Sequence, residues 1–174
     1  MISEEYKIRK AVETDYNQLE ILYNEARETI ASLGIDQWQN GYPDKKTVMA
    51  DIESERMYVL LSDNVVSGAF VLISDGEPTY DIIYNGNWKS GDTMSYIAIH
   101  RVAVSLRIRG KGASGCITRF AEDFAKNHNR KSLRIDTHEG NVVMRKMLEN
   151  KNFEYCGIIF LESGEKRVAY EKLL

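Results

Sequence analysis

The chain has 174 residues, 43% of them hydrophobic, and a formal net charge of −3. This length suits one domain over residues 1–174, and no apolar run is long enough to span a membrane. The acidic balance argues against a protein that coats nucleic acid. The two cysteines, Cys116 and Cys156, lack metal-ligand spacing and are expected to be buried free thiols in a cytoplasmic protein.

The first half of the chain predicts a strand, two helices and a hairpin. Apolar residues recur at three- and four-residue spacing from Leu19 to Leu33, which predicts an amphipathic helix that Gly34 ends. Two β-rich runs flank the Asp63-Asn64 turn, as in a hairpin. The expected elements are a strand at 6–11, helices at 19–33 and 44–56, and hairpin strands at 57–62 and 65–73.

The second half begins with residues 74–92, which are rich in turn formers but carry Tyr80, Tyr84 and Trp88. They are either a surface loop or an excursion that faces a ligand. The later elements are a strand at 94–104 interrupted at His100-Arg101, a helix from Lys111, a strand at 132–136, a helix at 141–150, and strands at 153–161 and 166–174. This order predicts a mixed α/β fold: a central, mostly antiparallel twisted sheet of six to seven strands flanked by about four helices, with one β-loop-α-β unit.

The loop 107–115, RIRGKGASG, joins the long strand to the following helix. Its glycines match the dinucleotide fingerprint G-x-G-x-x-G, but five residues separate them from the strand, and too little chain follows for the second half of such a fold. A triphosphate loop is excluded because Cys and Ile follow where Lys and Ser or Thr are needed. The amides of the loop still open into a helix N-terminus, and its three cations add charge. This predicts a pyrophosphate site, with a plain basic turn as the alternative.

Two segments resemble the GNAT superfamily of N-acetyltransferases. Residues 109–114, RGKGAS, resemble its Q/R-x-x-G-x-G/A signature, with Ser114 at the final small position. Asn141 through Phe153 resembles the N-x-x-A-x-x-L-Y…G-F pattern of the family. The resemblance implies transfer of an acetyl group from acetyl-CoA to a primary amine of a small molecule or peptide, by direct attack while both are bound and without a metal. A non-catalytic acetyl-CoA sensor of the same fold is the alternative.

The resemblance also implies where acetyl-CoA binds. Pantetheine would pair as a surrogate strand with the edge at Val102 and Val104, and its pyrophosphate would lie on the amides of 109–114. Asn141 would lie near the pantetheine arm, or would simply cap its helix. The expected cofactor-binding residues are Val102, Val104, Arg107, Arg109, Gly110, Lys111, Gly112, Ala113, Ser114 and Asn141.

The catalytic groups are less well defined, because Ala98 stands where some family members have a glutamate. His100, two residues further on, is a candidate general base, since histidine changes charge near neutral pH; the alternative is a histidine bonded within the sheet. His138 is the second candidate, or a solvated loop residue. Leu148 stands where many members have a tyrosine, so Tyr155 or water would protonate the leaving thiolate, unless it leaves without help.

Acceptor recognition is expected in the connection between the first two helices. There Asp36, Gln37, Trp38 and Tyr42 would form a wall with one carboxylate for a cation, although Trp38 could equally anchor the core. The expected partner is therefore the amine acceptor, with no nucleic acid and no membrane. The sequence leaves homodimerisation open.

Overall fold

A computed structural model describes residues 6–91 and 95–174. Residue 92 of the predicted excursion and residue 94 of the predicted strand lie outside these ranges. The chain divides into two compact units: the first runs up to Leu72 and includes Arg101–Ile117, and the second comprises Ile73–His100 and Thr118–Leu174. The single domain expected from the sequence stays a prediction.

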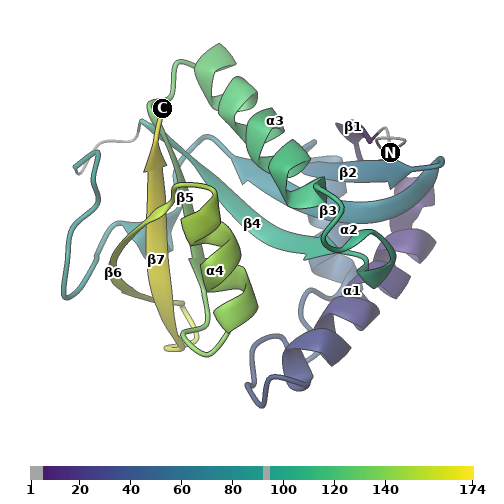
Figure 1. The fold of residues 1–174 in the computed structure, drawn as a ribbon, viewed down its shortest axis with the longest axis horizontal. Coiled ribbons are helices and arrows are strands. Elements are labelled where there is room, and N and C mark those ends of the chain that lie inside the picture. Colours follow the sequence, from purple (N-terminus) through teal and green to yellow (C-terminus); the bar gives the residue numbers. More distant parts are fainter. Residues whose placement is uncertain (1–5, 92–94) are drawn as a thin grey trace. The chain divides into compact units, whose positions relative to one another are not determined.

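Over the described residues, seven strands form a sheet in the order β1-β2-β3-β4-β5-β7-β6, accompanied by four α-helices (Figure 1). The strands are β1 Lys7–Lys10, β2 Met57–Ser62, β3 Val65–Ile73, β4 Tyr96–Val104, β5 Ser132–Thr137, β6 Glu154–Phe160 and β7 Lys166–Leu173. The helices are α1 Tyr16–Ala31, α2 Lys45–Glu53, α3 Ala113–Asn127 and α4 Val142–Asn150. The predicted mixed α/β fold is confirmed. Within the described residues, no helix combines the length and apolar character needed to cross a membrane.

The first unit contains the predicted hairpin. Strands β2 and β3 pair antiparallel, and the turn residues Asp63 and Asn64 have φ angles of 50° and 62°. Two consecutive residues with positive φ are typical of the turn whose twist matches that of a two-stranded hairpin, and Asn and Asp tolerate this conformation best after glycine. Helix α1 buries Leu19, Leu22, Tyr23 and Ile30, the positions at which the sequence places its apolar stripe.

In the second unit, β4 begins as a parallel neighbour of β5. The paired residues are Tyr96–Ala98 with Ser132–Arg134. In the part of the chain that the structure describes, this ladder stops there, although β4 continues to Val104 and β5 to Thr137. Strand β5 then pairs antiparallel with β7, and β7 with β6. The two strands of the β-loop-α-β unit are therefore hydrogen-bonded only at their starts.

Residues 74–91, from the excursion between β3 and β4, belong to the second unit and contact its strand β6. Tyr84 forms a bridge with Ile158 of β6. Tyr80 and Trp88 are buried, and the Trp88 indole N–H donates to the carbonyl of Tyr80 at 2.9 Å. A Cβ atom on Gly86 would lie 1.9 Å from the Cys156 carbonyl oxygen, so only glycine permits this approach to β6. The segment is thus fixed in place by β6 and by its own aromatic side chains.

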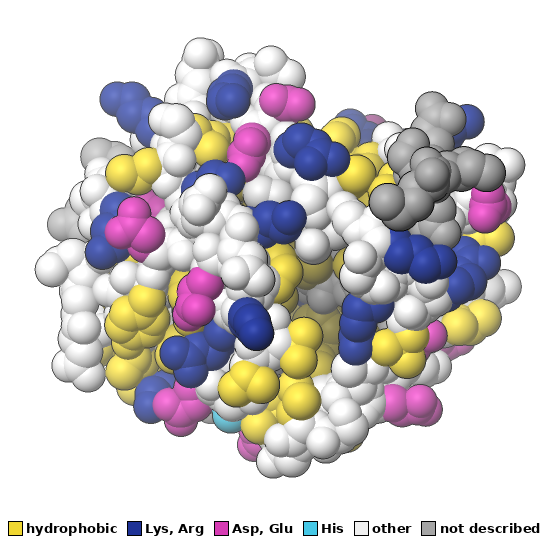
Figure 2. All heavy atoms as spheres, in the orientation of Figure 1, with side chains coloured by type: hydrophobic (Ala, Val, Ile, Leu, Met, Phe, Trp, Pro, Cys, Tyr) yellow, Lys and Arg dark blue, Asp and Glu magenta, His cyan; other side chains and the backbone are white. Residues whose placement is uncertain are grey.

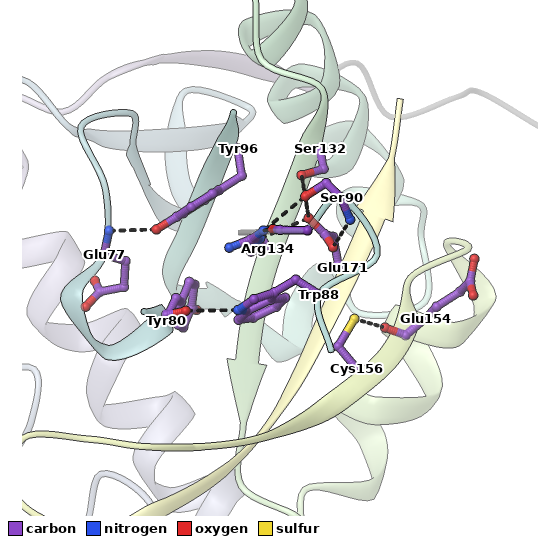
Figure 3. A network of polar contacts seen from close by, with 11 residues as sticks. Glu77, Tyr80, Trp88, Ser90, Tyr96, Ser132, Arg134, Glu154, Cys156 and Glu171 are labelled. Carbon is purple, nitrogen blue, oxygen red and sulfur yellow. Dashed lines mark hydrogen bonds and ion pairs between the residues drawn. The ribbon is translucent and has the colours of Figure 1, made fainter. Parts of the chain in front are cut away.

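A buried ion pair joins β5 to β7 beneath this excursion (Figure 3). The guanidinium Nε of Arg134 donates to Glu171 Oε1 at 2.9 Å, and the two side chains are 3% and 0% exposed. Ser132 and Ser90 also donate to the Glu171 carboxylate, at 2.6 and 2.5 Å. Burial alone would raise the pKa of Glu171, but these hydrogen bonds hold it below its ordinary value. The Arg134 guanidinium lies 4.2 Å from the centre of the Trp88 ring, which gives the charge a cation–π contact.

The two cysteines are free, as expected. Cys156 is buried, and burial raises the pKa of its thiol to about 11. Cys116 is only half-buried, so the prediction of two fully buried thiols was wrong for this residue. It lies at the first turns of α3, which begins at Ala113.

Candidate functional site

The glycine-rich loop of the first unit connects β4 to α3. A short 3-10 turn at Leu106–Ile108 comes first, with Ile108 buried as its anchor. Gly110 and Gly112 follow with φ angles of 76° and 91°, a conformation that side chains disfavour. The Gly112 carbonyl accepts from the amide of Cys116 at 3.2 Å, which makes Gly112 the residue at which the helix starts. At any helix N-terminus the first amides lack acceptors within the helix, and those of α3 follow directly on this loop.

Two amides of the predicted pyrophosphate site are used inside the loop. The amide of Arg109 donates to the Leu106 carbonyl at 3.3 Å, and that of Lys111 donates to Ile108 at 3.2 Å. An anion would therefore meet the side chains of these two residues rather than their amides. The helix start at Ala113 is the part of the loop whose geometry best suits a phosphate.

Basic side chains surround the loop. Figure 2 shows Lys and Arg side chains gathered over the segment between β4 and α3. Arg107, Arg109 and Lys111 are exposed, and the Arg107 guanidinium is fixed by a 2.7 Å hydrogen bond to the Ser67 hydroxyl. The Lys111 carbonyl accepts from the Tyr6 hydroxyl at 3.0 Å. Ser67 and Tyr6 thus bind the loop, and the side chains of its three cations remain exposed.

Val102 and Val104, the residues predicted to pair with pantetheine, are half-buried. Directly before them Arg101 has a φ of 52°, rare for a residue within a strand. Its carbonyl accepts from the buried Tyr23 hydroxyl at 2.8 Å. Its guanidinium makes a two-point ion pair with Asp51, with NH2–Oδ1 at 2.8 Å and Nε–Oδ2 at 2.7 Å. Backbone of this kind costs of order 1–3 kcal/mol and clusters at functional sites.

The predicted acceptor residues divide into two groups. Trp38 packs edge-on against Tyr23, with ring centroids 5.9 Å apart, and also contacts Tyr42. The Tyr42 hydroxyl accepts from the Arg101 guanidinium at 2.6 Å. Gln37 is buried, whereas Asp36 is exposed. The structure therefore places Trp38 and Tyr42 in one polar and aromatic cluster with Arg101.

His100 belongs to the second unit and is paired with a carboxylate. Its Nε2 lies 2.8 Å from Glu77 Oε2, and the two side chains are 16% and 17% exposed. The amide of Glu77 donates to the Tyr96 hydroxyl at 2.9 Å, as Figure 3 shows. Thr79 donates to Glu77 Oε1 through both its amide and its hydroxyl. The hydrogen bonds with Tyr96 and Thr79 therefore help to hold Glu77 in position beside the imidazole.

These contacts shift the ionisation of Glu77. Burial would raise the pKa of this carboxyl group, but the hydrogen bond and charge of His100, with the Thr79 hydrogen bonds, lower it further than burial raises it, to about 2. At neutral pH the carboxylate is charged and can orient the imidazole through Nε2. A role of His100 as general base, which stays a prediction, would use the other ring nitrogen, Nδ1.

We expect Glu77 to make folding stability depend on pH in the acid range. Its folded pKa of about 2 lies below the ordinary 4.5, so its contribution is complete above about pH 4.5 and is lost as the pH falls through about 2. Glu77→Gln removes this contribution, and its unfolding free energy should change less with pH over that window. Urea unfolding at several acid pH values tests this, with the exposed Glu162→Gln as the control. Parallel curves for wild type and Glu77→Gln would contradict the expectation.

Three other predicted residues have local structural contacts. The Asn141 side chain caps α4 by accepting from the Met144 amide at 3.2 Å, the simpler of its two interpretations. His138 Nδ1 accepts from the Gly140 amide at 3.0 Å. Tyr155 is 45% exposed, and its ring meets Tyr170 edge-on. Roles for them in ligand binding or proton transfer stay predictions.

Comparisons with known proteins found matches among solved structures. No family model matches it, and no curated protein does. Among solved structures, a GNAT-family acetyltransferase from Streptococcus agalactiae 2603 is 34% identical and covers 97% of this chain and 95% of its own, with a TM-score of 0.85. The chain belongs to the GNAT family of acetyltransferases.

More distant GNAT structures share the fold. A GNAT-family acetyltransferase from Listeria monocytogenes 4b F2365 is 20% identical over 97% of this chain and 95% of its own, with a TM-score of 0.70. The Salmonella typhimurium protein yncA, assigned as an acetyltransferase and solved with its cofactor acetyl-CoA, is 16% identical over 97% and 94%, with a TM-score of 0.67. The chain is thus an acyltransferase with the GNAT fold, and the dinucleotide and triphosphate alternatives are excluded.

Sequence reasoning on this GNAT enzyme missed the partners of its candidate residues. Glu77 is 23 positions from His100, and Asp51 is 50 positions from Arg101. The aromatic content of residues 74–92 was the one signal for an excursion that faces a ligand, and that interpretation stays a prediction. Among the described residues, no group of three or more His, Cys, Asp or Glu side chains is placed to hold a metal ion.

Proposed function

We propose that this GNAT enzyme transfers an acetyl group from acetyl-CoA to a primary amine of a small molecule or peptide, by direct attack while both substrates are bound. The observation that carries this proposal is the His100–Glu77 pair. It combines an imidazole with an oriented, charged carboxylate two residues before Val102 in the same strand. A cytoplasmic location and a homodimer stay predictions.

Acetyl-CoA binding is proposed for the first unit. The pyrophosphate would meet the start of α3, with Arg107, Arg109 and Lys111 as counter-charges. The edge of β4 at Val102 and Val104, beyond the last pair of the ladder with β5, would accept and donate the amide hydrogen bonds of pantetheine. Asp36, Gln37, Trp38 and Tyr42 keep their proposed role in recognising the acceptor, and Asn141 its proposed place beside pantetheine.

The proposed reaction needs three proton and charge movements. His100 Nδ1 takes a proton from the acceptor ammonium while Glu77 holds Nε2. The neutral nitrogen attacks the thioester carbonyl, a backbone N–H near Val102 stabilises the oxyanion, and the carbon–sulfur bond then breaks. The thiolate of CoA leaves and receives a proton from water or from Tyr155, while the new amide nitrogen loses its remaining extra proton to water. His138 is the second candidate for the base.

Thiol release and thermal unfolding test this proposal together. Acetyl-CoA should raise the Tm, and CoA thiol should appear with at least one amine of a broad panel. Gly112→Ala should raise the KM for acetyl-CoA about tenfold, because alanine disfavours the φ of 91° that opens the loop into α3. Failure of acetyl-CoA to raise the Tm, with no thiol released by any amine, would contradict the proposal.

A second glycine supplies the matched control. Gly164 lies in the β6–β7 turn with a φ of 86°, and, as at Gly112, an added Cβ meets nothing within 4 Å. Gly164→Ala should therefore cost similar stability and leave the KM for acetyl-CoA unchanged. An equal rise of KM in both variants would show that general destabilisation, rather than the loop, causes the effect. Acetyl-CoA binding without thiol release in any variant would favour the sensor interpretation.

A further inference from the structure

His100 and Asp136 occupy equivalent positions on β4 and β5. Ala98 and Arg134 form the last pair of the parallel ladder, and His100 and Asp136 come two residues later on their strands. Side chains two apart in a strand lie on the same face. The Arg134 guanidinium lies 4.2 Å from the ring centre of Trp88 in the excursion and 4.1 Å from that of Tyr96 on β4, so this face is the one under the excursion. The two side chains therefore begin the stretch in which the described strands are no longer paired.

The excursion supplies one partner to each of these side chains. Glu77 binds His100, and the Tyr80 hydroxyl donates to Asp136 Oδ1 at 2.6 Å. The Tyr80 ring also lies 5.8 Å from the His100 ring, centre to centre. Burial, followed by the nearby Asp136 carboxylate, raises the pKa of Tyr80 well above its usual value, so the hydroxyl remains a donor at neutral pH. Asp136 is thus held through one oxygen, and it is half-buried rather than enclosed.

The charges around this position are mostly negative. Glu77 and Asp136 bring two carboxylates to one imidazole and one phenol. Arg134, two residues before Asp136 on the same face of β5, is paired with Glu171. Lys166, on β7, pairs with Glu139 instead. A substrate carboxylate placed here would meet like charges, whereas a second positive group would meet Asp136.

We propose that Asp136 determines acceptor specificity by binding a second cationic group of the acceptor, while the reacting amine lies at His100. The acceptor class is then an amine that carries another positive charge, such as a diamine, rather than an amino acid. This inference rests on the proposed acetyl transfer. Tyr80 is the positioning residue that aims the Asp136 carboxylate.

Three acceptors of equal chain length test the inference: 1,4-diaminobutane, butylamine and 4-aminobutyrate. For the wild type, kcat/KM should be at least about tenfold higher for the diamine than for butylamine, and lowest for the amino acid. Asp136→Asn should bring the ratio of diamine to butylamine close to one. Tyr80→Phe, which keeps the ring but frees the carboxylate, should lower the ratio part of the way. Asp81→Asn, which changes an exposed carboxylate of the same excursion, should keep the wild-type ratio.

The outcomes separate this inference from the proposed function. Thiol release without preference for the diamine, or an equal loss for all three acceptors in Asp136→Asn, overturns the inference and leaves acetyl transfer standing. If no amine releases thiol, binding is tested instead, by the Tm shift that the diamine causes in the presence of CoA. A shift in the wild type that Asp136→Asn loses supports the binding role although acetyl transfer fails. No shift in the wild type overturns both. The wild-type measurements apply even if Asp136→Asn does not fold.

Discussion

His100→Gln lowers the kcat of acetyl transfer by about 10²–10⁴-fold, the range for losing a general base, while acetyl-CoA binding stays near that of the wild type. Glutamine can still donate to Glu77, so the hydrogen bond that places the side chain is kept. It offers no group that accepts a proton from an ammonium near neutral pH. Steady-state thiol release gives kcat, and isothermal titration with acetyl-CoA gives the affinity.

The pH profile distinguishes a base from a merely structural histidine. In the wild type, kcat/KM should rise with pH as the imidazole loses its proton, and this limb should be absent in His100→Gln. Glu77→Gln should keep the limb, because it leaves the imidazole in place. His138→Gln is the matched control and should keep both the rate and the profile. A large loss in His138→Gln with an active His100→Gln would transfer the role of base to His138.

Local pattern was enough to predict most of the fold. The hairpin strands at 57–62 and 65–73 have the predicted bounds, because β-branched runs on both sides of an Asp-Asn turn leave few alternatives. The glycine-rich loop was also placed correctly between β4 and α3. Its ligand could not be derived from glycine spacing, which matches a dinucleotide loop equally well. The surrounding order of strands and helices decided against that alternative.

The polar pairs of the second unit could not be predicted from the sequence. The contacts of Glu77 with His100 and of Glu171 with Arg134 join residues 23 and 37 positions apart. No periodicity links such positions, because the segment between them has to fold before they meet. The strand interruption predicted at His100-Arg101 was partly wrong. Strand β4 continues through it, and the irregularity is confined to the φ of 52° at Arg101, which the Asp51 ion pair and the Tyr23 hydroxyl hold.

Arg134→Met should lower the unfolding free energy by about 3–5 kcal/mol, the range for removing one partner of a buried ion pair. Methionine fills much of the space between the Trp88 and Tyr96 rings, so the loss comes mainly from charge rather than from a cavity. Glu171 would be left fully buried, with the Ser132 and Ser90 hydroxyls still donating to it. For a chain of this length, such a loss lowers the Tm by roughly 6–20 °C. Circular dichroism during urea and thermal unfolding measures both quantities.

Two further variants test whether Arg134→Met loses stability because it leaves the Glu171 charge unpaired. Lys166→Met breaks an ion pair with Glu139 whose side chains are 43% and 56% exposed, and it should cost at most about 1 kcal/mol. The double variant Arg134→Met with Glu171→Leu removes both buried charges and should recover much of the loss, since apolar replacements of whole buried pairs are often neutral. If Arg134→Met were as mild as Lys166→Met, the Glu171 carboxylate would have to be satisfied by its serine donors alone. If the double variant were less stable than Arg134→Met, the hydrogen bonds from Ser90 to Glu171, rather than the charge on Arg134, would hold the excursion to the sheet.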